Sequence, residues 1–210
     1  MTTGWSSRAK RSTASPSRAD AGPPPSRDVL HEAALAYLAR SSATAVTLRR
    51  ALDRKITTWA RRAERARDAE QVAADIAPCR EAVDAIIARF QEVGLVDDAA
   101  FAASRARGLS RAGRSRRAIA AHLAAKGVDE ETAREAIPND ADIELAAALT
   151  FARKRRIGPY AREATEDRGT KQKALAAMAR AGFGWSTCER ALRMDREQAD
   201  ERIDERLRNE

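Results

Sequence analysis

The side chains that could perform catalysis or hold a metal are few and lie far apart in the sequence. The two histidines, His31 and His122, are widely separated, and neither belongs to an HExxH pair on one helix face. A metal ion would need further ligands near each imidazole, and the sequence offers none. We therefore expect no metal, no cofactor and no catalytic histidine.

The cysteines also lack a chemical setting. Cys79 and Cys188 are too few for a disulfide framework. A thiol nucleophile needs surroundings that lower its pKa, and nothing near either cysteine supplies them. Both fall on the position that Ala133 takes in the repeat described below. We expect each of them to be a small, partly apolar structural side chain.

The segment GLVDDAAFA at 94–102 stops one helical pattern and starts another. Gly94 can adopt the left-handed conformation that closes a helix, and Asp97 or Asp98 can cap the next helix. Capping explains this acidic pair better than acid–base catalysis does. Since the ten glycines stand singly at expected helix boundaries, no phosphate-binding loop is present either. The sequence predicts a protein that is not an enzyme.

Basic residues, in contrast, are clustered, and the chain has a net charge of +8. A solvated surface is the usual meaning of a charge run. Arginines without neutralising acids repel one another, however, which favours a polyanion or an acidic protein groove as partner. No acid interrupts the six arginines of the central cluster, which are Arg105, Arg107, Arg111, Arg114, Arg116 and Arg117. Comparable clusters contain Arg49, Arg50, Arg54 and Lys55 before it, and Arg153, Lys154, Arg155, Arg156, Lys171 and Lys173 after it.

The elements that must position these cations are helices. Aromatic residues make up only 4% of the chain, and Ala, Leu, Arg and Glu dominate, which favours an all-α fold. Apolar residues recur at helical spacing. They predict helices around 35–38, 48–52, 83–90, 101–109, 119–123, 132–137, 143–157, 171–181 and 186–194. No apolar run approaches the ~20 residues of a membrane span, and the N-terminus lacks the apolar core of a secretory signal. We expect a cytoplasmic protein.

The helical pattern repeats along the chain. At a constant shift of 55 residues, 126–137 matches 181–192, pairing Gly127 with Gly182, and Ile119 and Leu123 fall on Ala174 and Met178. CREAV at 79–83 resembles the ends of both segments. The sequence thus predicts an elongated, curved stack of three three-helix repeats, at 28–96, 97–138 and 139–194.

Three segments lie outside the repeat. Residues 1–27 are rich in Ser, Ala, Pro and Arg, with five basic residues and one acid, and predict a disordered basic tail. Residues 56–78 are a charged insertion in the first repeat, expected to lengthen its second helix or to form a helical arm. Residues 195–210 carry seven acidic and four basic side chains, and predict a solvent-exposed terminal helix.

GLVDDAAFA at 94–102, RAIAAHLAAKGV at 117–128 and the threefold repeat resemble the RecX regulatory proteins, over roughly residues 30–193. The resemblance implies a non-enzymatic monomer that lies in the groove of a RecA filament on single-stranded DNA. It would restrain ATP hydrolysis and strand exchange in recombination and repair. The sequence departs from the family where Arg105 replaces a common aromatic, and where Lys55-Ile56 replaces Lys-Gly.

By position, the resemblance places the filament or DNA contact first on Arg114, Arg116, Arg117 and Lys126. Arg49, Arg50 and Lys55 come second, and the repeated clusters add Arg111, Arg155, Arg156 and Lys171. Two alternatives stay open. One is a direct DNA-binding regulator of helix-turn-helix type, which an arginine-rich second turn also suits. The other is a helical scaffold whose partner is purely protein.

Overall fold

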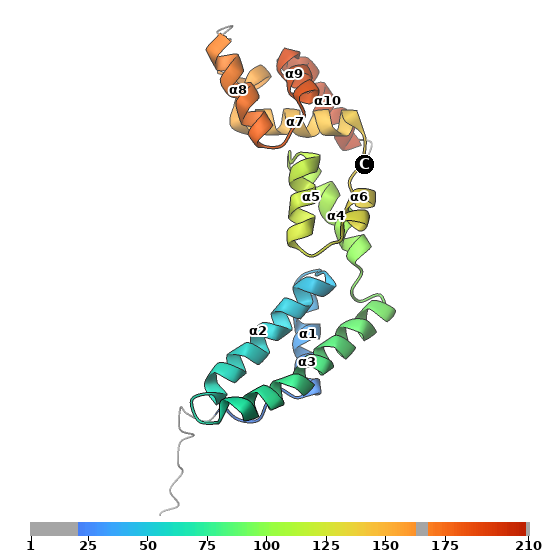
Figure 1. The fold of residues 1–210 in the computed structure, drawn as a ribbon. Helices are drawn as coiled ribbons and strands as arrows, with labels where there is room; N and C mark the ends of the chain where they lie inside the picture. The colour runs from blue at the N-terminus through green and yellow to red at the C-terminus, as the bar shows by residue number, and fades with distance from the viewer. Residues whose placement is uncertain (1–20, 163–167, 209–210) are drawn as a thin grey trace, which may run out of the picture.

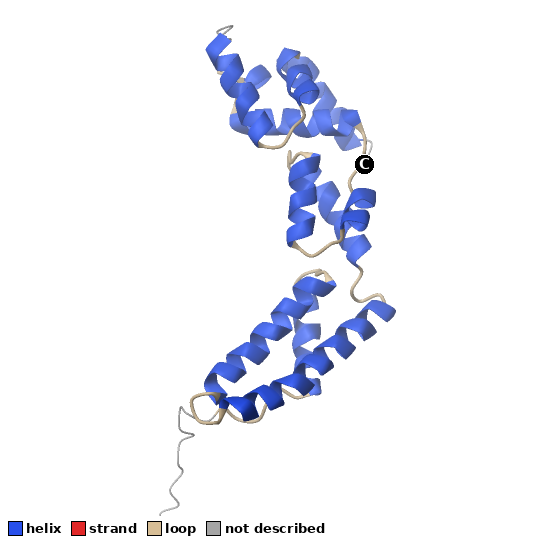
Figure 2. Cartoon of the chain, in the orientation of Figure 1, coloured by secondary structure: helices blue, strands red, loops and turns tan. Residues whose placement is uncertain are grey.

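The computed structural model describes residues 21–162 and 168–208, and over these residues it contains helices and turns but no strand (Figure 2). The predicted all-α class is confirmed. The first three helices are α1 (Arg27–Leu38), α2 (Ala45–Ala63) and α3 (Ala69–Glu92). They are followed by α4 (Asp98–Arg111), α5 (Arg116–Ala125) and α6 (Glu130–Ala136). The last group contains α7 (Ala141–Arg155), the 3-10 turn η1 (Gly158–Tyr160), α8 (Arg168–Arg180), α9 (Trp185–Arg193) and α10 (Arg196–Arg208).

Buried side chains divide these helices into three modules, each with its own core. Module 1 (α1–α3) packs around Leu48, Val83 and Phe90, and module 2 (α4–α6) packs around Ile119 and Leu123. Module 3 (α7–α10, with η1) has the third core, which includes Leu149 and Met178. The modules follow one another along an elongated, curved body (Figure 1). No helix in the described part of the chain is both long and apolar enough to cross a membrane.

The structurally equivalent position predicted for the cysteines lies in all three cores. Cys79, Ala133 and Cys188 are 3%, 6% and 1% exposed, one in each module. Burial is the main cause that raises the pKa of both thiols, which keeps them protonated. Their environment is therefore that of small core residues, as the repeat predicted.

The charged insertion extends two helices of module 1. Residues 56–63 continue α2, and 69–78 form the first part of α3, so that Pro78 lies inside that helix. At the tip, Trp59, Val72 and Ile76 pack together with Ala21 in a small cluster of their own. The carbonyl of Gly22 accepts hydrogen bonds from Trp59 Nε1 (3.2 Å) and from the Arg67 guanidinium (2.9 Å).

Part of the predicted tail is ordered. Most of the expected tail, residues 1–20, lies outside the described residues. Residues 21–26 are placed, however, and α1 begins at Arg27. Residues 21–26 pack against module 1. Ala21 contacts the tip of the insertion, and the carbonyl of Pro25 accepts a hydrogen bond from the Cys79 thiol at 3.4 Å.

The predicted terminal helix is present as α10, but it is not solvent-exposed on every side. Ala199 and Ile203 of α10 are 0% and 4% exposed and belong to the core of module 3. Their four-residue spacing forms a narrow apolar stripe that packs against α7. Tyr160 also donates its hydroxyl hydrogen to Asp200 at 2.7 Å. The apolar stripe is visible in the sequence, but the charged residues around it gave no indication that it packs against another helix.

Candidate functional site

The second helices of the three modules stand end to end along one side of the body. Figure 1 shows α8, α5 and α2 following one another in the same direction along the concave side. The C-terminal end of α8 meets the N-terminal end of α5, and the C-terminal end of α5 meets the N-terminal end of α2. We call these three helices the column. It is held together by two joints.

The joint between α5 and α2 depends on Thr44, the N-cap of α2. Its Oγ1 accepts from the backbone N–H of Thr47 and donates to the carbonyl of Lys126, the C-cap of α5, at 2.6 Å. Asp98 of α4 accepts from the N–H of Ala45 at 2.8 Å, so it caps α2 rather than its own helix. Asp97 caps α4 through the N–H of Ala100 at 2.8 Å. The two aspartates thus serve different helices.

The joint between α8 and α5 has the same construction. Ser115, the N-cap of α5, accepts from Ala118 N–H and donates to the carbonyl of Ala181 at 2.6 Å. Glu144 of α7 accepts from the N–H of Arg116 at 3.1 and 3.3 Å. Lys126 and Ala181 are related by the 55-residue shift found in the sequence. One arrangement is therefore used twice to join successive modules.

Each joint also requires a glycine. Gly127 and Gly182 have φ values of +81° and +92°, which L side chains rarely adopt. A Cβ atom on Gly127 would lie 2.4 Å from Val46 Cβ, and one on Gly182 would lie 2.7 Å from Ser115 Oγ. Close contact between the modules therefore depends on the missing side chain at both positions.

Thr44 provides a direct test of the first joint. Replacing Thr44 by Val leaves the N–H of Thr47 without its cap and removes the hydrogen bond to Lys126, at a site that is 0% exposed. We expect a loss of about 2 kcal/mol in the free energy of unfolding, measured by urea denaturation. Thr44→Ser keeps the hydroxyl and should retain most of the stability. Equal losses in both variants would contradict the assigned role of the hydroxyl.

The predicted contact residues lie on the column and close to it. Arg50 and Lys55 are exposed on α2, and Lys171 is exposed on α8. Arg114, Arg116 and Arg117 are exposed at the start of α5, where no carboxylate among the described residues lies within ion-pair distance of them. Exposed arginines also end the neighbouring first helices, Arg111 on α4 and both Arg155 and Arg156 at the end of α7.

Several of the predicted cations have structural contacts. Arg49 forms an ion pair with Asp84 of α3. Arg50 donates to the carbonyl of Ala125 at 3.1 Å, so it belongs to the first joint. Lys126 is half-buried as the C-cap of α5. These contacts weaken the case for Arg49 and Lys126 as contacts to a partner, and leave the start of α5 as the strongest position.

Further cations on the column were not among the predicted contacts. Arg54 and Arg61 are exposed on α2, four and eleven residues after Arg50, and so lie on the same helix face. Arg180, at the end of α8, lines a hollow of about 380 Å³ with Arg117, across the second joint. Only the stacking order of the modules brings Arg180 next to Arg117. We call the following ten exposed cations, which lie on the column or just before α5, the basic ridge: Arg50, Arg54, Lys55, Arg61, Arg114, Arg116, Arg117, Lys171, Lys173 and Arg180.

One histidine lies beside the ridge and responds to its charge. Arg105 donates from Nε to His122 Nε2 at 3.1 Å. Burial, followed by the charges of Arg105, Lys126 and Arg114, lowers the pKa of His122 below its ordinary value of 6.5. The neutral imidazole is therefore the form that the folded protein favours. Among the described residues, no group of three or more His, Cys, Asp or Glu side chains could hold a metal ion.

This shift gives a pH dependence of stability. Because the unfolded chain binds a proton at His122 more readily than the fold does, stability should fall as the pH drops below 6.5. His122→Gln keeps an acceptor for Arg105 and cannot titrate. Urea denaturation at about pH 7.5 and about pH 5.5, on either side of the ordinary histidine pKa, should show a smaller loss in the variant than in wild type. An identical loss would show that other groups dominate.

Comparisons with known proteins give a consistent result. Residues 97–137, which contain all of module 2, match the family model described as RecX, second three-helix domain. The chain is 33% identical to the regulatory protein RecX of Myxococcus xanthus over 166 residues, covering 78% of this chain and 83% of that protein. It is 40% identical to the RecX of Agrobacterium fabrum over 106 residues, covering 50% of this chain and 56% of that protein.

Solved structures match the fold as well. The crystal structure of RecX from Lactobacillus salivarius superposes with a TM-score of 0.58 at 19% identity, over 83% of this chain and 96% of that one. A second crystal structure, of a regulatory protein RecX, gives a TM-score of 0.57 at 22% identity, over 78% of this chain and 70% of that one. At these identities the superpositions concern the fold alone.

Proposed function

Since this chain belongs to the RecX family of regulatory proteins, we propose that it regulates the RecA recombinase by binding along the recombinase filament on single-stranded DNA. The observation that supports the proposal is the column, which carries exposed cations from three modules. At 1.5 Å per residue, the 19, 10 and 13 residues of its helices amount to about 63 Å of helix. A surface of this length suits a polymeric partner.

Electrostatics supports a polyanionic contact within that filament. The cations at the start of α5 are exposed and unpaired among the described residues, so they can approach phosphates without first breaking ion pairs. Contacts of this kind release counterions and weaken with salt. We propose that the chain inhibits ATP hydrolysis and strand exchange by occupying the filament, without a reaction of its own.

The geometry of the second joint argues against the helix-turn-helix alternative. A recognition helix inserts its N-terminal residues into the major groove. The N-terminus of α5 instead meets the end of α8, where Ser115 bonds to Ala181 and Gly182 approaches Arg117. The exposed face of α5 between Arg117 and Lys126 also consists mainly of alanines, among them Ala121, Ala124 and Ala125. A specific operator is therefore not expected.

The proposal is tested by titrating the purified chain into RecA, ATP and single-stranded DNA. Hydrolysis should fall at substoichiometric amounts of the chain, as expected for a long surface that lies along a polymer. The inhibition should weaken as salt is raised. No change in hydrolysis or in filament length at saturating protein would reject the proposed function. Protection of one discrete duplex sequence in footprinting would favour the helix-turn-helix alternative.

A further inference from the structure

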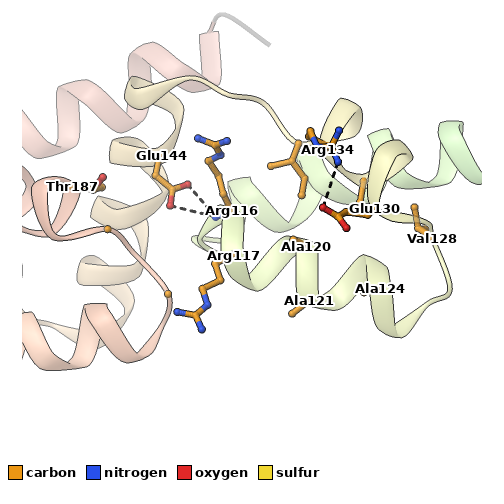
Figure 3. Close-up of a pocket in the computed structure, with 14 residues that line it drawn as sticks. Arg116, Arg117, Ala120, Ala121, Ala124, Val128, Glu130, Arg134, Glu144 and Thr187 are labelled. Carbon is orange, nitrogen blue, oxygen red and sulfur yellow. Dashed lines mark hydrogen bonds and ion pairs between the residues drawn. The ribbon is translucent and has the colours of Figure 1, made fainter.

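A second surface lies beside the column in module 2. It is a groove of about 760 Å³ between α5 and α6, bounded at one end by Gly182, Gly184 and Thr187 of module 3 (Figure 3). Its floor is made of Ala120, Ala121, Ala124, Val128, Ala133 and Ile137. Arg116, Arg117 and Arg134 stand on its rim. The groove thus combines a hydrocarbon floor with a cationic edge.

The groove in module 2 is lined by small side chains where module 3 has large ones. The 55-residue shift pairs Ala120 with Leu175 and Val128 with Phe183 of module 3. Phe183 is 4% exposed and packs on Phe151 with ring centroids 5.6 Å apart, and Leu175 packs against the same core. Module 3 therefore fills with large side chains the space that module 2 leaves open.

The rim also differs between the modules. The same shift pairs Arg134 with Glu189, so the cation on this side of module 2 is replaced by an acid in module 3. In module 2, Arg134 lies 3.4 Å from Glu130, and both side chains are largely exposed, so this pair is weak and solvent-screened. Arg134 is therefore available to a stronger acidic partner, together with Arg116 and Arg117.

The chemistry of the groove favours a peptide over a nucleic acid. Bases bind to proteins by stacking on aromatic rings, and none of the residues that line the groove is aromatic. A phosphate chain carries a charge at every nucleotide and would meet Glu130 and Glu144 in the wall, whereas a peptide can place its carboxylates beside the arginines alone. An aliphatic side chain fits the alanine floor, and a carboxylate fits the arginine rim.

We propose that this groove binds an acidic peptide segment of the recombinase protomer, which places an aliphatic side chain on the floor and carboxylates against Arg116, Arg117 and Arg134. The inference rests on the proposed function for the identity of this partner. The part of α5 that lines the groove runs from Arg116 to Ala124, about 12 Å at 1.5 Å per residue. That length accommodates about four residues of extended peptide.

The test uses overlapping synthetic peptides that span the recombinase sequence, added to the isotopically labelled full chain. At least one acidic peptide with an aliphatic residue should shift the NMR signals of Ala120, Ala121, Ala124 and Ala133. The amides of α2 should not move. If no peptide shifts the groove signals, or if the shifting peptides are basic, the inference is overturned.

Two variants probe the groove by different means. Ala120→Leu with Val128→Phe installs the module 3 side chains and should fill the floor. Arg134→Glu reverses one rim charge at an exposed position, where loss of folding is not expected. Each should weaken peptide binding at least tenfold, and Arg89→Glu on α3 is the matched control for charge. Unchanged binding in Arg134→Glu would overturn the inference even if the filled variant failed to fold.

Filament binding separates this inference from the proposed function. If wild type binds the filament while no peptide reaches the groove, the groove inference alone fails. If wild type does not bind the filament at all, the proposed function fails and the identity of the peptide fails with it. If both are correct, Arg134→Glu should bind the filament more weakly than Arg89→Glu does, although both change the charge equally.

Discussion

Replacing Arg114, Arg116 and Arg117 together by alanine is expected to weaken binding to the recombinase filament at least tenfold. These side chains are exposed, and the described residues offer them no ion pair, so their removal should leave helix content and unfolding temperature nearly unchanged. Each phosphate contact on a single strand contributes about 0.7 to the slope of log affinity against log salt. The triple variant should therefore lower that slope by about 2 if all three contact phosphates.

The matched control removes the same charge elsewhere. Arg80 and Arg89 on α3 and Arg107 on α4 are exposed but lie outside the column. Their triple alanine variant should bind the filament nearly as well as wild type. Equal losses in the two triples would mean that net charge alone drives binding, which would contradict the assignment of the basic ridge. Arg116 and Arg117 belong to both the ridge and the groove, so the groove variants avoid them.

Gly127→Ala is expected to lower the free energy of unfolding by about 2–5 kcal/mol, the largest stability effect among these variants. Alanine at a φ of +81° costs about 1–2 kcal/mol in backbone strain. The added Cβ would lie 2.4 Å from Val46 Cβ, and relieving such an overlap costs about 1–3 kcal/mol. Thermal and urea denaturation should both report the loss.

Gly108→Ala is the control for this substitution. Gly108 lies inside α4 with open space around its Cβ position and without a positive φ. Alanine there should stabilise the protein slightly, because it reduces the entropy of the unfolded chain and favours the helix. Similar unfolding midpoints for the two variants would show that the close approach of Gly127 to Val46 does not constrain the first joint.

The helices and their cores could be predicted from the sequence because both follow from short-range spacing. Ile119 and Leu123 recur at helical distance and are 1% and 0% exposed, and their register partners Ala174 and Met178 are 5% and 0% exposed. The glycines paired by the same shift, Gly127 and Gly182, share a left-handed conformation. Periodicity within a module and register between modules were both visible before any contact was known.

The contacts between modules could not be predicted, because nothing in the periodicity of one module specifies which end meets its neighbour. Asp98 shows this most clearly. Its place beside Asp97 predicted a cap for the following helix, yet it caps α2, which precedes it by fifty-three residues. Arg50 likewise belongs to a charge cluster in the sequence but bonds to the end of α5. The order in which the modules stack determines that Asp98 and Arg50 both serve the first joint.

The groove was hidden for a different reason. Ala120, Ala121 and Ala124 stand in an alanine-rich chain, where small residues are ordinary for helices and carry no signal of a cavity. Only the packing of α6 against α5 shows that no large side chain fills the space between Ala120 and Val128. The comparison with Leu175 and Phe183 becomes informative once the structure shows that these residues are packed in module 3.

Because the caps are shared, an isolated module would lose hydrogen bonds that stabilise it in the whole chain. Thr44 and Ser115 each serve their own helix and the carbonyl of the next module, so a chain cut between modules would expose a hydroxyl and a carbonyl that now satisfy each other. Stability is then a sum of intrinsic terms and nearest-neighbour couplings, as in a one-dimensional array. A truncation that removes module 3 would first weaken the capping of α5. The loss of stability should be largest in module 2 and smallest at the far end of α2 in module 1.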